Sequence, residues 1–338
     1  MGGVCRQSRA AHEGADTVLT APSVLASPRQ ARIAVIILTG NEAVHVERAI
    51  RSVSSFAAQT LVVDSFSTDD TIAIARGAGA LAVAHPFVTQ ALQFQWALDN
   101  LPLDAEWVMR LDADEVPTDE LVEEIRRRLS ALPSDVAGVN LRRRHVFLGR
   151  WIRHGGRYPV TLLRIWRKGA ARVERRWMDE HMVLLRGRAI TFDHDFSDHN
   201  LSDLSAFTAK HNGYATREAI DILTRRYGLA PVEAALSRNS ASRQAAAKRR
   251  IKQRIYNRLP FWLGPFGYFL YRYFVRMGFL DGPEGLVYHV LQGFWYRFLV
   301  GAKVLEFDRE LRPLHDHQAR LATLARLAGY KASDFDGG

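Results

Sequence analysis

Short apolar segments alternate with amphipathic ones along the first third of the chain. Four segments are dominated by Val, Ile, Leu and Ala and predict strands buried on both faces: residues 33–38, 60–64, 81–84 and 107–112. Between them, hydrophobic residues recur at helical spacing over 44–56, 72–78 and 93–101. Strands that alternate with helices predict right-handed crossovers and a mostly parallel, Rossmann-like sheet, which is an α/β fold.

The pattern changes after residue 120. A basic amphipathic helix is predicted over 121–129, and strands over 138–141 and 161–166 predict an antiparallel extension of the sheet. A long helical pattern covers 203–229. Metal-type ligands gather at residues 193–199, but no cysteine or H-E-x-x-H pattern accompanies them. We therefore expect a solvated loop there and no zinc site.

Composition adds a charge imbalance to this picture. The 338 residues are 47% hydrophobic and 24% charged, which is ordinary for a globular protein, but the net charge is +10. That excess implies an anionic partner, namely nucleic acid, an anionic membrane or a phosphorylated substrate. The single cysteine excludes an internal disulfide framework. Residues 1–31 contain no apolar stretch of the secretory type, and no uninterrupted apolar run is long enough to predict a membrane-spanning helix.

The fourth predicted strand ends in three acids, Asp112, Asp114 and Glu115. Open α/β sheets bind ligands at the carboxyl ends of their strands. Side chains two positions apart on extended backbone point the same way, so Asp112 and Asp114 are candidates to hold one Mg²⁺ or Mn²⁺ together with substrate phosphates. The alternative is an acidic turn before a helix that begins near Thr118.

Polar residues also follow the first two predicted strands. Asp64 ends the second strand and can accept a hydrogen bond from a base or ribose, and residues 65–70 lead into a helix N-terminus with free hydroxyl and N–H groups. The alternative is that Ser67 and its neighbours only cap that helix. Asn41 and Glu42, after the first strand, allow the same two interpretations.

Taken in order, three motifs resemble the family 2 glycosyltransferases with the GT-A fold. The motif T-x-N-E stands at residues 39–42, V-V-D-S-x-S-T-D-x-T at 62–71, and L-D-A-D-E at 111–115. The resemblance covers roughly residues 32–225 and points to the branch of lipopolysaccharide-core, capsule and exopolysaccharide sugar transferases. One departure from that branch is Phe94, where a basic residue is usual.

The resemblance implies a role for each matched position. The residues implied to bind the nucleotide-sugar donor are Thr39, Asn41, Glu42, Asp64, Ser67 and Asp112. Asp112 and Asp114 are the implied ligands of Mg²⁺ or Mn²⁺. Either Asp179 or Glu180 is the implied catalytic base, which takes the proton of the acceptor hydroxyl. The implied acceptor-side residues are Gly155, Gly156, Arg157, Arg164 and His181.

Two of these assignments have simpler alternatives. The pair Asp179 and Glu180 could instead neutralise neighbouring arginines on the surface. An ordinary hairpin turn would explain Gly155 and Gly156 equally well.

A basic tract and an aromatic stretch follow the predicted domain. Residues 238–258 contain eight Lys and Arg residues and no acid, and Phe, Trp and Tyr are frequent from 261 to 298. Cations next to aromatics suit a membrane surface, so we expect membrane contact through residues 238–300. Packing of a helical subdomain is an alternative. We expect no nucleic-acid binding, because no recognised reader motif is present.

The sequence thus predicts a tail over 1–31, a GT-A domain over 32–230, a basic and aromatic helical membrane-surface segment over 231–310 and a C-terminal tail over 311–338. The expected function is inverting, metal-dependent transfer of a sugar from a nucleotide-diphosphate donor to a lipid-linked or oligosaccharide acceptor. We expect it in cell-surface polysaccharide or lipopolysaccharide synthesis, in the cytoplasm at the inner face of the membrane.

Two other classes of protein remain open at this stage. One is a sugar-phosphate nucleotidyltransferase, although the Gly-rich basic loop of that class is absent after the first strand. The other is a non-enzymatic, membrane-attached basic binding protein.

Overall fold

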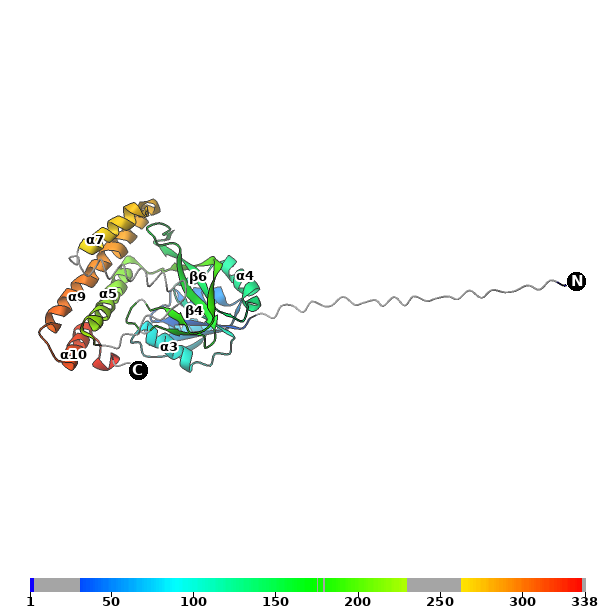
Figure 1. Ribbon diagram of the computed structural model, residues 1–338, viewed down its shortest axis with the longest axis horizontal. Coiled ribbons are helices and arrows are strands. Elements are labelled where there is room, and N and C mark those ends of the chain that lie inside the picture. The colour runs from blue at the N-terminus through cyan, green and yellow to red at the C-terminus, as the bar shows by residue number, and fades with distance from the viewer. Residues whose placement is uncertain (3–30, 175, 179, 230–262, 336–338) are drawn as a thin grey trace.

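A nine-stranded sheet runs through the first two thirds of the protein, and a layer of long helices lies beside it (Figure 1). The computed structural model describes residues 1–2, 31–174, 176–178, 180–229 and 263–335. The strand order is β3-β2-β1-β4-β8-β6-β11-β5, with β7 paired to β6. The fold is therefore α/β with a mostly parallel first half, as the sequence predicted.

The first four strands are parallel and coincide with the predicted ones: β1 (Ile33–Thr39), β2 (Ala57–Asp64), β3 (Leu81–Ala84) and β4 (Trp107–Asp112). Every residue of β1 is buried, because helices cover both faces of the sheet. This burial explains the continuous apolar runs in the sequence.

Successive residues of β1 pack into two separate cores. Ile33, Val35 and Ile37 face α1 (Val46–Val53), α2 (Thr71–Gly77) and α4 (Asp119–Arg128). Ala34 and Ile36 face α3 (Gln90–Asn100) and the hairpin of β9 (Ala171–Val173) and β10 (Met182–Leu184). A short 3₁₀ turn, η1 (Leu129–Ala131), follows α4.

The sheet continues beyond β4 with mixed pairing. Its strands are β8 (Val160–Arg167), β6 (Val136–Phe147), β7 (Arg150–Trp151), β11 (Arg188–His199) and β5 (Glu115–Pro117). β8 is antiparallel to β4 and β6, as predicted, whereas β11 is parallel to β6 and antiparallel to β5.

The expectation of a solvated loop at residues 193–199 was wrong. These residues form the end of β11, and Asp195 is only 3% exposed. Cations of β6 make this burial possible: Arg144 contacts Asp195 at 2.7 Å, and Arg143 contacts Asp198 at 3.4 Å.

The helical layer is built from α5 (Leu204–Tyr227), α9 (Tyr296–Leu311) and α10 (His317–Ala328), which lie side by side in Figure 1. The remaining helical segments are α7 (Leu263–Leu270), the π-helical η2 (Tyr271–Val275), η3 (Gly278–Asp281), α8 (Gly282–Tyr288), the π-helical η4 (His289–Trp295) and η5 (Ala332–Asp334).

Helix α10 lies within the segment expected to be a tail. Its Leu324 is fully buried in one core with Leu223 of α5 and Phe307 of α9. Helix α5 therefore packs with the C-terminal helices as well as following the sheet. The basic tract 238–258 and residues 3–30 lie outside the described residues. In the part of the chain that is described, no helix combines the length and the apolar character needed to cross a bilayer.

Candidate active site

The acids predicted at the ends of β2 and β4 lie at the same edge of the sheet. Asp112 is level with Leu38 of β1, and Asp64 is level with Thr39 of β1. The two acids thus flank the end of β1, about 10 Å apart by the spacing of strands. The parallel register brings the donor-binding and metal-binding candidates together.

Asp112 is held by two guanidinium groups. Arg110 Nε lies 3.3 Å from one carboxylate oxygen, and Arg164 Nη2 lies 3.3 Å from the other. Burial alone would raise the pKa of Asp112, but Arg110 and Arg164 hold it well below its usual range. Glu115 accepts a 3.0 Å hydrogen bond from the Asp112 N–H and contacts Arg164. Asp112 is therefore an ionised, fixed carboxylate.

Asp114 is surrounded differently. Its side chain accepts a hydrogen bond of 3.0 Å from Asn200 Nδ2, and Lys210 Nζ of α5 lies 4.0 Å away. Burial, and then the charges of Asp198, Asp112 and other carboxylates, raise the pKa of Asp114 despite Lys210. Carboxylates that repel one another in this way are a favourable environment for a divalent cation.

Glu42, from the loop after β1, joins the same cluster. Its carboxylate lies 2.6 Å from His45 Nδ1 and 3.5 Å from Lys210 Nζ. Burial raises its pKa, but the hydrogen bond from His45 and the charge of Lys210 outweigh that effect and lower it. Lys210 therefore connects Glu42 with Asp114.

These residues fit a divalent cation that is only partly held by protein. Asp112 and Asp114 offer carboxylate oxygens, the ligand type of Mg²⁺ and Mn²⁺. No group of three or more His, Cys, Asp or Glu side chains suited to a metal occurs among the described residues. A cation here would need oxygens of substrate phosphates and water to complete its coordination.

The remaining donor-side candidates form hydrogen bonds between the loop after β1 and the loop after β2. Asp64 is fully buried and accepts hydrogen bonds from Thr39 Oγ1 at 2.8 Å and from the Ser67 N–H at 2.7 Å. Asn41 donates its N–H to Ser67 Oγ at 2.7 Å and accepts the N–H of Thr68 at 2.8 Å. Thr39, Asn41, Asp64 and Ser67 thus form one network that fixes the shape of this edge.

Of the two candidate bases, Glu180 is described and Asp179 lies outside the described residues. Glu180 Oε1 accepts a 2.9 Å hydrogen bond from Arg110 Nη2, and the side chain is 7% exposed. Because Arg110 also contacts Asp112, Glu180 lies one side chain away from the metal-binding candidates.

Gly155 and Gly156, two of the acceptor-side candidates, pack against the C-terminal helices. Both have positive φ, and a Cβ at Gly155 would lie 2.1 Å from the His289 ring. The Gly155 carbonyl accepts a 2.7 Å hydrogen bond from Arg272 Nε of η2. The absence of a side chain at Gly155 thus allows His289 and Arg272 of the C-terminal helices to lie close to its backbone.

The other acceptor-side candidates are dispersed. Arg157 stacks on Tyr288, 5.2 Å from the ring centre. Arg164 contacts Asp112 and Glu115 and is therefore part of the acidic edge. His181 lies at the start of the β9–β10 hairpin, 3.7 Å from Glu174.

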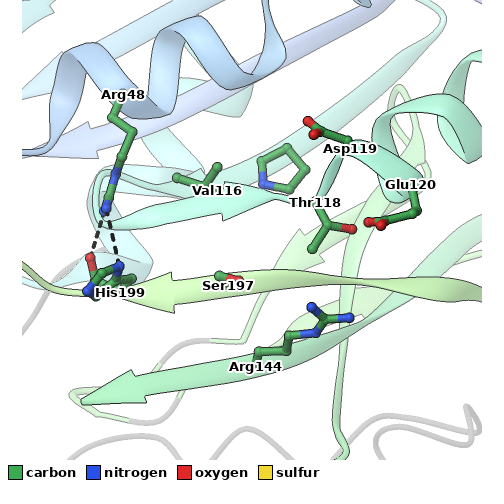
Figure 2. Close-up of a pocket in the computed structure, with 9 residues that line it drawn as sticks. Arg48, Val116, Thr118, Asp119, Glu120, Arg144, Ser197 and His199 are labelled. Carbon is green, nitrogen blue, oxygen red and sulfur yellow. Dashed lines mark hydrogen bonds between the residues drawn. The ribbon is translucent and has the colours of Figure 1, made fainter. Parts of the chain in front are cut away.

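A cavity of about 410 Å³ lies behind the acidic edge. Figure 2 shows Arg48 reaching from α1 to His199, whose carbonyl accepts a 2.6 Å hydrogen bond from it. Val116, Ser197 and Arg144 line the cavity, and they alternate along their strands with Glu115, Asp198 and Arg143. Because alternate residues face opposite sides of a sheet, the cavity opens on the side away from those charged residues. None of the predicted site residues lines it.

Sequence reasoning missed four residues that position the acids, namely Arg110, Asn200, His45 and Lys210. Arg110 did leave a signal, since a cation inside an otherwise apolar strand needs a buried partner. The other three had none, because they follow polar or amphipathic stretches in which such residues are common.

Comparison with known proteins points to a glycosyltransferase family. Residues 34–192 match the family described as Glycosyl transferase family 2. A 94-residue stretch is 40% identical to an uncharacterized glycosyltransferase of Rickettsia felis and 43% identical to one of Rickettsia conorii. It covers 28% of this chain and 32% or 33% of those proteins. The match thus spans about a third of the length of these curated relatives.

Solved structures give only weak similarity. One is titled a mycobacterial protein, with 23% identity, a TM-score of 0.30, and coverage of 34% of this chain and 42% of that one. Another is glucosyl-3-phosphoglycerate synthase from Mycobacterium tuberculosis in complex with Mn²⁺, uridine-diphosphate and glucosyl-3-phosphoglycerate, with 22% identity, a TM-score of 0.27, and coverage of 34% and 44%. These values carry no weight in the assignment, which is based on the family match and the motifs of the acidic edge. Residues 34–192 therefore resemble a glycosyltransferase domain of family 2.

Proposed function

We propose that this protein is an inverting, metal-dependent glycosyltransferase that moves a sugar from a nucleotide-diphosphate donor to a saccharide acceptor. The observation that carries the proposal is the shared edge at which Asp64, Glu42, Asp112 and Asp114 meet. A family 2 glycosyltransferase domain supports the reaction class.

Each side chain of the acidic edge has a proposed role in binding the metal or the donor. Asp112 and Asp114 would hold Mg²⁺ or Mn²⁺, which when bound supplies positive charge to the departing nucleoside diphosphate. Arg110 and Arg164 keep Asp112 ionised and oriented. The network of Thr39, Asn41, Asp64 and Ser67 shapes the surface on which the nucleotide would lie.

The acceptor hydroxyl needs a base as it attacks the anomeric carbon. Glu180, which accepts a hydrogen bond from Arg110, is proposed for this role, and Asp179 is the neighbouring candidate. In a single displacement the carboxylate takes the hydroxyl proton, the new glycosidic bond forms, and the bond to the diphosphate breaks on the opposite face.

The acceptor is proposed to be a lipid-linked saccharide in cell-surface polysaccharide or lipopolysaccharide synthesis. Support comes from an exposed apolar surface on the C-terminal helices, which we call the apolar patch. Its side chains are 37% to 69% exposed: Leu263, Phe266, Leu270, Tyr271, Phe274, Val275, Met277, Phe279, Leu280 and Leu286. So many exposed large apolar side chains within residues 263–286 are unusual on a protein surface that faces only water.

Arginines lie beside the apolar patch. Arg150 contacts the Leu280 carbonyl at 3.5 Å and Glu284 at 3.7 Å, the backbone N–H of Arg153 contacts Asp281 of η3, and Arg276 follows η2. Aromatic and apolar side chains bordered by arginines suit an anionic membrane surface. We therefore propose that the protein binds the inner face of the membrane through the apolar patch, together with the basic tract that lies outside the described residues.

The deciding experiment is incubation of the full chain with a set of nucleotide sugars and Mn²⁺, with analysis of the products. Released nucleoside diphosphate supports a glycosyltransferase, whereas pyrophosphate release from a nucleoside triphosphate and a sugar phosphate would indicate a nucleotidyltransferase. Asp114→Asn should abolish turnover without loss of folding, since it removes one of several repelling carboxylates. Unchanged turnover in Asp114→Asn would remove the metal assignment, and Asp119→Asn on exposed α4 is the matched control.

A further inference from the structure

Three arginines converge between β6 and the C-terminal helices, around the ring of Tyr288. Arg157 lies 5.2 Å and Arg272 lies 5.9 Å from the centre of this ring, measured from the guanidinium carbon. Arg143 of β6 is close enough for the charge interaction between it and Arg157 to lower the pKa of Arg157. Tyr288 is 1% exposed and Arg272 is 3% exposed. Cations are thus gathered where water has little access.

The nearby carboxylates do not balance these cations. Asp198 is shared by Arg143 at 3.4 Å and His145 Nδ1 at 3.0 Å. Asp281 is occupied by His154, through its ring at 2.7 Å and its N–H at 2.9 Å. The Arg157 side chain has no ion pair or hydrogen bond within the described residues. Burial, together with the charges of Arg272 and Arg143, lowers the pKa of Arg157 against the opposing effect of Tyr288.

Polar atoms in this cluster also lack partners. Tyr288 Oη, Arg157 Nε and Arg272 Nη2 are buried and make no hydrogen bond to any described residue. A buried donor without a partner destabilises a folded protein, so three such donors around one ring favour a ligand that accepts hydrogen bonds there. All three can donate, which suits an oxyanion.

The cluster lies between two surfaces that the proposed function already uses. Asp198 is level with Glu115 in the β11–β5 pairing, and its charge reaches Asp114. On the other side, Arg272 belongs to η2, whose Phe274 is 57% exposed in the apolar patch. A ligand at Tyr288 would therefore lie between the membrane surface and the metal-binding acids.

We propose that Arg157, Arg272 and Tyr288 bind a non-reacting phosphate group of the acceptor. Guanidinium groups pair with phosphate oxygens through two parallel N–H donors, and the phenol supplies a further donor. The inference rests on the proposed glycosyltransferase function. It adds that the acceptor carries a phosphate group, which this site recognises. The same phosphate chemistry could be carried by a lipid or by a soluble sugar.

The test is calorimetric titration of inorganic phosphate into the full chain with EDTA present, so that no metal contributes. Wild type should bind phosphate, and Arg157→Gln should bind at least tenfold more weakly. Arg144→Gln is the matched control, because Arg144 is the next residue of β6 after Arg143, points to the opposite face and pairs with Asp195. Equal weakening in Arg144→Gln and Arg157→Gln, or no binding by wild type at millimolar phosphate, would overturn the proposal.

Tyr288→Phe keeps the ring and removes only the hydroxyl, so it stays informative if Arg157→Gln does not fold. It should weaken phosphate binding several-fold with an unchanged melting temperature. Unchanged affinity in Tyr288→Phe and also in a folded Arg272→Gln variant would show that phosphate does not bind here.

Two further titrations identify the source of the phosphate. Glucose 1-phosphate reports a soluble acceptor, and farnesyl phosphate in neutral vesicles reports a lipid-linked one; Arg157→Gln should weaken whichever binds. Metal-dependent hydrolysis of a nucleotide sugar is measured separately. Its absence with phosphate binding intact would refute the glycosyltransferase proposal alone, and its presence without phosphate binding would refute the phosphate site alone.

Discussion

Arg110 and Glu180 are 70 residues apart in the chain, and their side chains form an ion pair with 2.9 Å between Nη2 and Oε1. Arg110 is fixed in β4, two positions before Asp112. The pair therefore ties the segment before β10 to the strand that carries the metal-binding candidates. In the proposed reaction, this position brings a candidate base next to the candidate metal ligands.

If Glu180 is that base, Glu180→Gln should lower kcat by about 10²-fold or more, the usual contribution of general-base catalysis. The amide keeps an oxygen for Arg110, so the melting temperature should change little. Asp179→Asn is measured beside it, and Glu47→Gln, at an exposed side chain of α1, is the control. Full activity in both Glu180→Gln and Asp179→Asn would refute the proposal that either residue is the base.

Lys210 balances Glu42 and Asp114, so its removal should make the acidic edge more attractive to a cation. Lys210→Met should lower the free energy of unfolding by about 1 kcal/mol, a modest value because the side chain is 40% exposed. Mn²⁺ should then raise the melting temperature of Lys210→Met more than that of wild type, since binding to the folded state alone stabilises it. Lys303→Met serves as control. Equal Mn²⁺ responses in all three proteins would contradict the assignment of Asp112 and Asp114 as metal ligands.

The buried imidazole of His289 predicts a loss of stability in mild acid. Burial, and then the charges of Arg272 and Arg157, lower the pKa of His289 to about 3 against the opposing effect of Asp281. The folded state therefore keeps His289 neutral while the unfolded state binds a proton below pH 6.5. Stability is fully present above that pH and falls as the pH drops from 6.5 towards 3, by at most about 1.4 kcal/mol per pH unit for one proton.

Denaturant unfolding at pH 7.0, 6.0 and 5.0 measures this dependence. His289→Asn should show a shallower fall than wild type, although His211, whose pKa is lowered to about 4 chiefly by burial, keeps part of it. His317→Asn at the exposed start of α10 should retain the full slope. Identical slopes in wild type and His289→Asn would show that His289 is not neutral in the folded protein.

The apolar patch predicts binding to anionic vesicles. Phe274→Ser combined with Val275→Ser should weaken co-sedimentation with phosphatidylglycerol vesicles, because both side chains are more than half exposed and would leave water on binding. Leu185→Ser, equally exposed but on the turn after β10, is the matched control. Arg153→Gln should weaken binding to anionic vesicles by about 1 kcal/mol and leave binding to neutral ones unchanged. Equal binding by the Phe274/Val275 double variant and wild type would exclude this surface as the membrane contact.

The sequence predicted the parallel half of the fold well because buried strands leave a strong local signal. The apolar run of β1 follows directly from burial on both faces, and the acids after β4 mark the carboxyl edge of the sheet. The antiparallel β8 and the helix α5 were likewise predicted. These elements depend on local periodicity, which the sequence carries in full.

The polar strand β11 could not be predicted in the same way. Its Asp195 and Asp198 are buried only because Arg144 and Arg143 come alongside from β6, about 50 residues earlier. From the sequence alone, a buried carboxylate that is paired with an arginine on another strand cannot be distinguished from a carboxylate in water. The positioning of Asp114 by Asn200 and Lys210 was hidden for the same reason.

The contacts of helix α5 limit how short a fragment of this chain can be while it retains the acidic edge. The family match ends at residue 192, but Asn200 and Lys210, which lie after that residue, both contact Asp114. The C-terminal half of α5 packs against α9 and α10 in one buried core. A fragment trimmed to the recognisable homology would keep the acids but lose the groups that orient them. The smallest fragment that keeps the acidic edge together with these supporting contacts therefore extends to α10.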